Sequence, residues 1–110
     1  MKITLIHAKG FNDYPFMLWK MDKLVAGIDR KRLKFYTRKC DGHSHQYAFE
    51  AKAFCYAICH DADAEEMAGK SRNLVVFECD KRDPETAAII KAAEAKGVKV
   101  KSYKRPKETS

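Results

Sequence analysis

The tripeptide Gly69-Lys70-Ser71 has the residue types that close the phosphate-binding loop of nucleoside triphosphate hydrolases. Such a loop also needs a glycine five positions before the Gly of Gly-Lys-Ser and a strand leading into it, so that backbone amides wrap a phosphate. Position 64 is alanine, and the preceding residues DADAEEMA, at 61–68, indicate the start of a helix. The sequence therefore disfavours a triphosphate hydrolase, and the stretch 68–73 needs another explanation.

Cysteine and histidine could hold zinc, because thiolates and imidazoles are its usual ligands. The candidates are Cys40, His43, His45, Cys55, Cys59 and His60. Only the loop CDGHSH at 40–45 offers a clustered set, and the spacing fits no common finger or ribbon. Cys40 with His43 or His45 could also form a nucleophile pair, but that requires hydrogen-bond geometry which spacing does not supply. We expect no metal and no cofactor, with a zinc site at 40–45 as the alternative.

Four aromatic residues near the N-terminus could stack on nucleic-acid bases beside lysines, as single-strand binders do. They are Phe11, Tyr14, Phe16 and Trp19, with Lys9 and Lys20 beside them. Aromatic residues at helical spacing are more often core residues, which is our expectation for Phe16 and Trp19. Phe11 and Tyr14 precede the helix and could form a ligand rim.

Composition favours one globular domain. The chain has 110 residues, is 45% hydrophobic and carries a formal net charge of +7. No apolar run approaches the ~20 residues that span a bilayer, and the N-terminus lacks signal-peptide features. We therefore expect a cytoplasmic protein with reduced cysteines and no membrane contact. The basic excess is compatible with nucleotides, nucleic acid or an acidic protein as partner, and a homo-oligomer is also compatible.

Hydrophobic patterning predicts alternating strands and helices. Strands are expected at 2–7, 33–37, 74–79 and 98–103. Helices are expected from Pro15 to 27–29, at 47–60 and within 61–73. A last helix is expected from Pro84 to Gly97, with Asp83 as its N-cap. A competing interpretation pairs 33–40 with 45–51 as a hairpin around Asp41-Gly42. Alternation of this kind predicts an α/β fold, a mostly parallel sheet of four to five strands flanked by helices on both faces.

Three blocks, taken in order, resemble the YspA-type, YpsA-related branch of the SLOG superfamily of Rossmann-like domains. They are HAKGFNDYPFMLWKMDKL at 7–24, DADAEEMAGKSRN at 61–73 and LVVFECDKRDPETAAIIKAAEAKGVKV at 74–100. The resemblance implies a single Rossmann-like three-layer domain over residues 1–104, followed by a basic disordered tail at 105–110. The family's glycine-rich loop after the second strand is eroded, with only Gly42 left. The segment from there to Ser71 looks too short for both a helix and a full third strand.

The resemblance also implies a ligand site at the loops after strands one and two and at AGKSRN. The expected ligand-binding residues are Lys9, Gly10, Asn12, Asp13, Arg38, Lys39, Gly69, Arg72 and Asn73. Arg72 and Asn73 are expected to present donors at the carboxyl edge of the sheet, or alternatively to close a helix before a strand. The Pro-Gly-Gly-x-Gly-Thr motif of the family's catalytic hydrolases is absent, so enzyme activity of that kind is not expected.

The leading hypothesis is a non-catalytic domain that binds a nucleotide-derived ligand, to sense or sequester it, and its small size suits an accessory protein of phage type. One alternative is an interaction module whose basic surface binds nucleic acid or a host protein. The other is a nucleotide hydrolase, for which Asp13, Asp63 and Glu66 are the candidate general bases, although no second catalytic group is evident.

Overall fold

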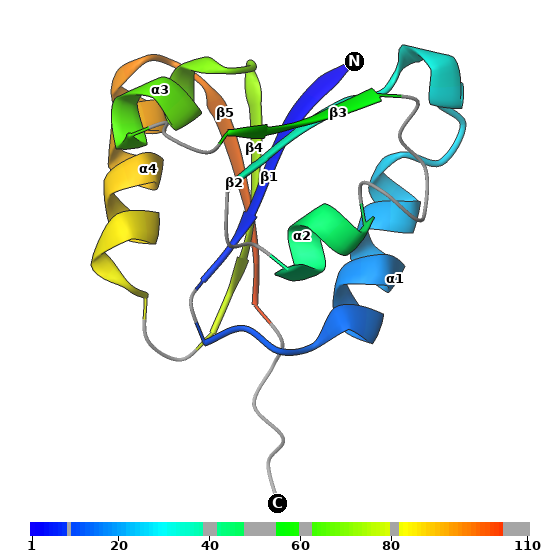
Figure 1. The fold of residues 1–110 in the computed structure, drawn as a ribbon, viewed down its shortest axis with the longest axis horizontal. Helices are drawn as coiled ribbons and strands as arrows, with labels where there is room; N and C mark the ends of the chain where they lie inside the picture. Colours follow the sequence, from blue (N-terminus) through cyan, green and yellow to red (C-terminus); the bar gives the residue numbers. More distant parts are fainter. Residues whose placement is uncertain (9, 39–41, 48–54, 60–62, 80–81, 105–110) are drawn as a thin grey trace, which may run out of the picture.

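Five parallel strands form the centre of the structure (Figure 1). The computed structural model describes residues 1–8, 10–38, 42–47, 55–59, 63–79 and 82–104. The strands are β1 (Lys2–His7), β2 (Lys34–Arg38), β3 (Cys55–Cys59), β4 (Asn73–Glu78) and β5 (Lys99–Lys104). They lie in the order β3-β2-β1-β4-β5, and every neighbouring pair is parallel. The predicted fold class, a single Rossmann-like α/β domain, is confirmed. The predicted tail at 105–110 lies outside the described residues.

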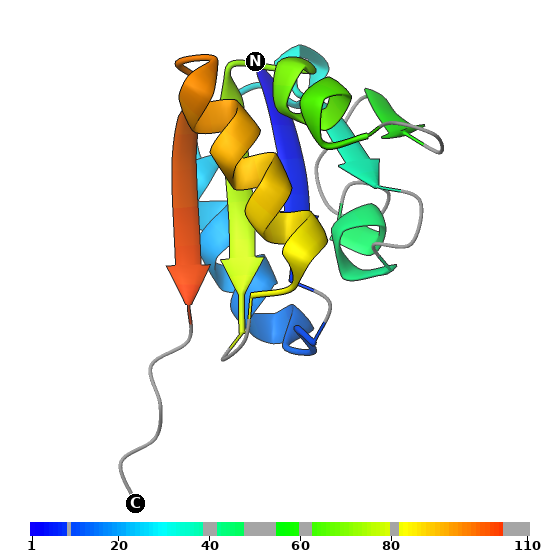
Figure 2. The ribbon, with the colours of Figure 1, turned by 90° about the vertical axis from the view of Figure 1, so that its left-hand side faces the viewer.

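Helices cover both faces of the sheet (Figures 1 and 2). Helices α1 (Tyr14–Leu24) and α2 (Gly42–Tyr47) lie on one face, and α3 (Ala64–Gly69) and α4 (Pro84–Ala95) lie on the other, with a 3₁₀ turn at Arg30–Arg32 before β2. Parallel neighbours must be joined by right-handed crossovers. The chain adds β2 and β3 on one side of β1 and then crosses back to add β4 and β5 on the other side. Because the direction across the sheet reverses, α3 and α4 lie on the opposite face from α1 and α2.

Aspartate caps begin three of the helices. Asp13, Asp63 and Asp83 precede α1, α3 and α4, and each carboxylate accepts a backbone N–H from three residues further on, at 3.2, 2.9 and 3.0 Å. These bonds satisfy amides that the first turn leaves unpaired. Gly97 adopts a φ of +74° after α4, so the predicted cap and stop of that helix are confirmed. Helix α1 ends at Leu24, earlier than the predicted 27–29.

Two apolar clusters hold the layers together. The cluster under α1 and α2 contains Ile3, Leu5, Phe11, Phe16, Met17, Met21, Val25, Leu33, Phe35, Tyr47, Val75 and Phe77. The cluster under α3 and α4 contains Ile6, Met67, Ala68, Leu74, Val76, Ile89, Ile90, Ala92 and Ala93. Successive residues of a strand point to opposite faces, so β1 and β4 supply side chains to both clusters.

The segment between β2 and α3 differs from its predictions. The helix predicted at 47–60 is wrong, because Cys55–Cys59 forms strand β3. The hairpin alternative is wrong too, because β3 pairs parallel to β2 and residues 42–47 are helical. The expectation that this segment is too short for a helix and a third strand is therefore also wrong. A short apolar run carries no periodicity that separates strand from helix, and pairing with β2 decides its structure. Residues 48–54 lie outside the described part.

Tyr47 anchors α2 to the core. Its ring is fully buried and meets Phe35 edge-on at 5.8 Å, and its hydroxyl donates to Oδ1 of Asp22 in α1 at 3.1 Å. Burial first, and then the adjacent Asp22 carboxylate, raises the pKa of Tyr47 far above its ordinary value. The neutral hydroxyl is thus the form that the folded protein requires.

The free energy of unfolding should decrease as the pH rises above about 10, the ordinary tyrosine pKa. There the unfolded chain releases the Tyr47 proton and the folded protein keeps it, which contributes a slope of up to about 1.4 kcal/mol per pH unit. Tyr47→Phe keeps the ring, lowers stability by about 1 kcal/mol at neutral pH and removes this slope. Urea unfolding across the alkaline range measures both quantities. Equal alkaline slopes in the two proteins would contradict the assignment.

Candidate functional site

The carboxyl ends of β1 and β4 mark the point where the chain reverses its direction across the sheet. The chain leaves β1 towards α1 on one face and leaves β4 towards α4 on the other, so the two connections diverge (Figure 2). In open α/β sheets, ligands collect in the crevice at such a point. This edge is therefore the first place to examine for a site.

A cluster of rings lies on the α1 side of this edge. His7, at the end of β1, is 5.7 Å from the ring of Phe11 and 5.8 Å from that of His43 in α2. Tyr14, which begins α1, stacks on His43 at 5.6 Å with an interplanar angle of 22°. Phe11 is buried against Phe77 of β4, whereas Tyr14 and His43 are half-buried. The structure thus separates a core residue, Phe11, from two rings that a ligand could meet.

Two predicted ligand residues, Asn12 and Asp13, lie at this edge. Asn12 is exposed, and its Oδ1 lies 3.2 Å from Nε2 of His43. Asp13 caps α1 through the backbone N–H of Phe16. The carboxylate therefore occupies the helix N-terminus, where a phosphate would otherwise bind. Asn12 is thus open to solvent at this edge, and Asp13 has a structural role that the sequence interpretation did not include.

Arg38 ends β2 and lies at the same edge. Its guanidinium donates to the carbonyl oxygen of His7, and it lies 3.7 Å from Oε1 of Glu85 in the first turn of α4. The residue is only 9% exposed, so these contacts hold the cation in one position. The predicted Lys9 and Lys39 lie outside the described residues.

Gly10 brings the loop after β1 against the residue that follows β4. A Cβ built at Gly10 would lie 3.2 Å from Sγ of Cys79, tighter than most real contacts. A side chain at position 10 would therefore need the Cys79 side chain to move by a few tenths of an ångström. Gly10, predicted as a ligand residue, thus lies in close contact with Cys79 at this edge.

Three buried polar atoms near the end of β2 and the start of α2 have no hydrogen-bond partner within the described part of the chain. They are Oγ1 of Thr37, Nδ1 of His43 and Oγ of Ser44. Thr37 shares the face of β2 with Phe35, the face that α1 and α2 cover. In the neutral tautomer of His43 that carries its proton on Nε2, this nitrogen donates to Oδ1 of Asn12. The other ring nitrogen, Nδ1, is then an acceptor without a donor among the described residues. No sequence signal marks Thr37 or Ser44, because their burial depends on how α2 packs. For His43, the sequence analysis predicts only metal or nucleophile chemistry.

Two of the three candidate general bases are engaged in helix capping. Asp13 and Asp63 both serve as helix caps, and Asp63 accepts the backbone N–H of Glu66. Among the side chains that the structure describes, no set of three or more from His, Cys, Asp or Glu could hold a metal. Of the zinc candidates, Cys40 and His60 lie outside the described residues, as do the side chains of His45, Cys55 and Cys59.

The other predicted ligand residues lie at the opposite edge of the sheet. Gly69 ends α3, and Asn73 is the first residue of β4, in register with Lys99 at the start of β5. The expectation that Arg72 and Asn73 lie at the carboxyl edge is therefore wrong. Residues that follow a helix and precede a parallel strand must lie at the amino edge. The predicted residues thus form two groups at opposite ends of the sheet.

The stretch 68–73 makes the turn between α3 and β4. Oγ of Ser71 donates to the carbonyl oxygen of Asn73 at 2.7 Å and lies 2.9 Å from Oγ1 of Thr4. The side-chain amide of Asn73 donates to the carbonyl oxygen of Lys2 at 3.1 Å, and Lys99 N–H donates to the carbonyl of Arg72. These bonds fix β4 between β1 and β5. The stretch 68–73 is therefore a structural turn that joins α3 to β4.

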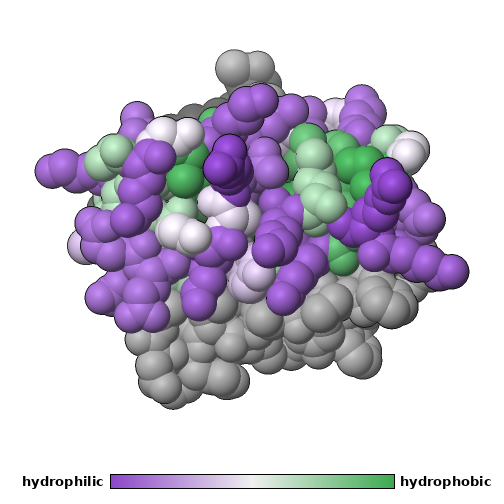
Figure 3. All heavy atoms as spheres, turned by 90° about the horizontal axis from the view of Figure 1, so that it is seen from above, coloured by the Kyte–Doolittle hydropathy of each residue, from purple (hydrophilic) through white to green (hydrophobic). Residues whose placement is uncertain are grey.

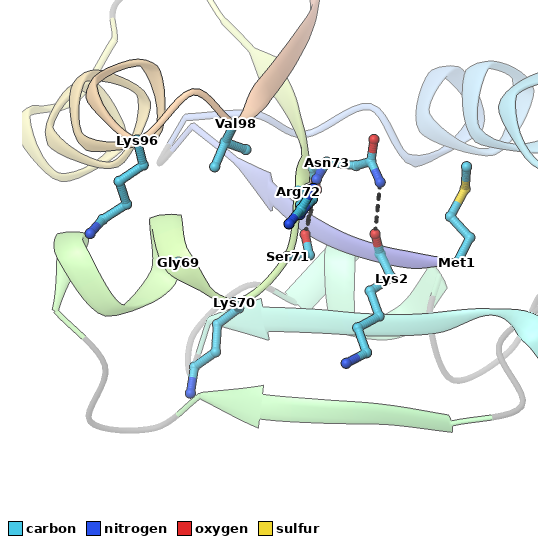
Figure 4. A pocket seen from close by; sticks show the side chains of 9 residues that line it. All are labelled: Met1, Lys2, Gly69, Lys70, Ser71, Arg72, Asn73, Lys96 and Val98. Atoms are coloured by element: carbon cyan, nitrogen blue, oxygen red, sulfur yellow. Dashed lines mark hydrogen bonds between the residues drawn. The ribbon is translucent and has the colours of Figure 1, made fainter.

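A shallow pocket of about 630 Å³ opens at this amino edge (Figure 4). It is lined by Met1, Lys2, Gly69, Lys70, Ser71, Arg72, Asn73, Lys96 and Val98. Seen from the amino ends of the strands, the surface is mainly hydrophilic, with smaller apolar areas between the charged side chains (Figure 3). Of its lysines, Lys96 pairs with Glu65 at 3.2 Å. The pocket is basic, in contrast to the carboxyl edge.

Comparisons with protein-family models, with curated proteins and with solved structures find no match for this chain. Within the described ranges, none of the helices combines the length and apolar character needed to cross a membrane. The fold and the geometry of the two edges therefore carry the functional argument.

The buried hydroxyls of Thr37 and Thr4 should respond oppositely to replacement by valine. Thr37→Val removes a buried hydroxyl that lacks a partner among the described residues, and we expect it to stabilise the protein by about 1 kcal/mol. Thr4→Val breaks the bond to Ser71 and should destabilise the protein by about 1 kcal/mol. Urea unfolding with unchanged m-values measures both effects. Equal destabilisation by the two changes would show that the Thr37 hydroxyl is hydrogen-bonded in solution.

Proposed function

We propose that this chain is a small non-catalytic domain that binds a nucleotide-derived ligand at the carboxyl edge of its sheet, to sense or sequester it. The main support is that buried polar atoms of Thr37, His43 and Ser44 lie near one another and have no hydrogen-bond partner among the described residues. Nearly all buried polar groups in native proteins are hydrogen-bonded. A local group of exceptions at the edge where α/β proteins bind ligands therefore supports a site whose hydrogen bonds a bound molecule completes.

The rings at this edge suit a base. Tyr14 and His43 are stacked and half-buried, and an aromatic face of this kind accepts a heterocyclic base. Nδ1 of His43 can accept a hydrogen bond from an exocyclic amino group, and Asn12 lies beside it with an exposed amide. Thr37 and Ser44 lie deeper, where a ligand group or an ordered water would complete their hydrogen bonds.

Charge at this edge favours the nucleoside part of a ligand over a long phosphate chain. Asp13, Asp83 and Glu85 all lie at the N-termini of helices that start here. The two described arginines at this edge already face carboxylates, since Arg38 lies near Glu85 and Arg82 donates to Glu78 at 2.6 Å. A triphosphate would meet repulsion from the aspartates and Glu85, whereas ribose hydroxyls can donate to carboxylates.

The resemblance to the YspA-type SLOG domains supports the same location, because it implies contacts at the loops after the first two strands. An accessory protein of phage type and a cytoplasmic location remain part of this proposal. The engagement of Asp13 and Asp63 as helix caps supports a binding function over hydrolysis, because one oxygen of each carboxylate already accepts a backbone N–H.

A thermal-shift series tests the proposal. The probes are the four common nucleosides with their mono- and triphosphates, and ADP-ribose. A compound that binds only the folded state at a concentration of 100 times its Kd raises Tm by about 10 °C for a domain of this size. We expect one base to give a shift, and its nucleoside or monophosphate to bind at least as tightly as its triphosphate.

Variants locate the site. His43→Ala should abolish the shift, and Thr37→Val should reduce it. Arg72→Ala is the matched control, because Arg72 is exposed at the opposite edge and should leave the shift unchanged. The proposal fails if no probe shifts Tm, or if Arg72→Ala removes the shift while His43→Ala preserves it.

A further inference from the structure

Trp19 is exposed although its position in α1 predicted a core residue. Its side chain is 52% exposed, whereas Phe16, one turn earlier in the same helix, is 8% exposed. The sequence expectation is therefore correct for Phe16 and wrong for Trp19. Met1 is the other large apolar residue that is exposed in the described part of the chain. An exposed tryptophan leaves a large apolar face in water, which is a feature of binding surfaces.

Two lysines lie beside this tryptophan. Nζ of Lys20 lies 4.1 Å from the centre of the Trp19 ring, and Nζ of Lys23 lies 4.8 Å from it. Both distances are within the range of cation–π attraction. The ring and the two charges are thus presented together on the solvent side of α1.

The same kind of surface continues onto the edge strand β5. Nζ of Lys20 is 5.8 Å from the ring of Tyr103, and Nζ of Lys101 is 5.7 Å from that ring. Tyr103 is half-buried and stacks on Phe77 at 5.2 Å, which fixes its orientation on the sheet. Two aromatic rings from distant parts of the sequence therefore share Lys20, and each has a further lysine beside it.

A groove runs beside these residues. It has a volume of about 450 Å³ and is lined by Met1, Ile3, Leu24, Asn73, Leu74, Val75, Lys99, Val100 and Lys101. Through Met1 and Asn73 it adjoins the basic pocket at the amino edge, where Lys2, Lys70 and Arg72 lie. Among the described residues, no acidic side chain lines either hollow.

We propose that the basic–aromatic surface formed by Trp19, Lys20, Lys23, Lys99, Lys101 and Tyr103 binds single-stranded nucleic acid. Bases stack on Trp19 and Tyr103, and the lysines contact the phosphates between and beside them. Proteins that hold single strands combine aromatic platforms with a positive groove in this way. A duplex keeps its base faces inside the stack, so it can use the lysines and not the rings.

Protection of the sheet edge accounts for only part of this surface. Lysines on an edge strand prevent pairing with other chains, which would explain Lys99 and Lys101. That role requires no exposed ring on α1 and no lysines beside that ring. The pairing of Trp19 with Lys20 and Lys23 therefore favours a partner that has both flat rings and negative charge.

The fluorescence of Trp19 tests the proposal directly, because it is the single tryptophan of the chain. Titration with an oligothymidylate of about 12 nucleotides should quench this fluorescence with saturation, since bases stack on the ring. Four lysines predict that log K falls with log[salt] with a slope of about −3. A duplex of equal length and a poly-glutamate peptide should leave the fluorescence nearly unchanged.

Anisotropy of a labelled oligothymidylate measures the variants. Trp19→Ala should weaken binding about 5- to 150-fold, and Trp19→Phe should restore most of the loss because it keeps a ring. Lys101→Ala should reduce the magnitude of the salt slope by about 0.7. Lys91→Ala is the matched control, an exposed lysine of α4 on the opposite face of the sheet, and should change nothing.

The proposal is overturned by three results. They are absence of binding to the single strand, binding that Trp19→Ala leaves unchanged, and equally tight binding of the duplex or of poly-glutamate. The last two would indicate a general polyanion surface. His43→Ala, which removes a residue of the carboxyl edge, should leave oligonucleotide binding unchanged, so this test is independent of the proposed nucleotide site.

Discussion

The structure depends on the parallel pairing of β1 with a strand on each side. Residues 3–8 are all buried, and β1 is in register with β2 at Lys2–Thr4 and with β4 at Thr4–His7. A strand buried on both faces needs helices on both faces, and parallel partners can be reached only by crossovers. These requirements fix where every other segment lies. Residues that follow a strand reach the carboxyl edge, and residues that precede one reach the amino edge.

Helix capping then separates charge between the two edges. The helices run antiparallel to the strands, so their N-termini lie at the carboxyl edge and their C-termini at the amino edge. Aspartates cap the first group, and Lys23, Lys70 and Lys96 lie in the last turn or at the cap of the second. Each choice is favourable for the helix dipole. Repeated over three helices, this pattern places aspartates at the carboxyl edge and lysines at the amino edge. Such a distribution is consistent with the proposal that a polyanion binds away from the crevice.

Local signals predicted most of the fold. Helix α4 was predictable because Asp83, Pro84 and Gly97 mark its limits. Strands β1 and β4 were predictable because each is an apolar run of strand length. Strand β3 was not, because five residues of mixed apolar character acquire their structure from pairing with β2. Chain order alone would have placed Arg72 at the amino edge, since it precedes a strand. The exposure of Trp19 depends on the rotation of α1 on the sheet, which helical spacing of apolar residues does not specify when they surround most of a helix.

Helix α1 carries residues of both proposed sites. Tyr14 and Trp19 are five positions apart, about 7.5 Å along the helix axis. Between them and the sheet, Met17 and Met21 are fully buried, so α1 cannot shift without repacking the core. Packed interfaces move between discrete arrangements and do not slide by small amounts. A ligand shifts such an equilibrium only if it binds two arrangements with different affinity. Because Met17 and Met21 hold α1 against the core, we expect the two proposed sites to bind independently.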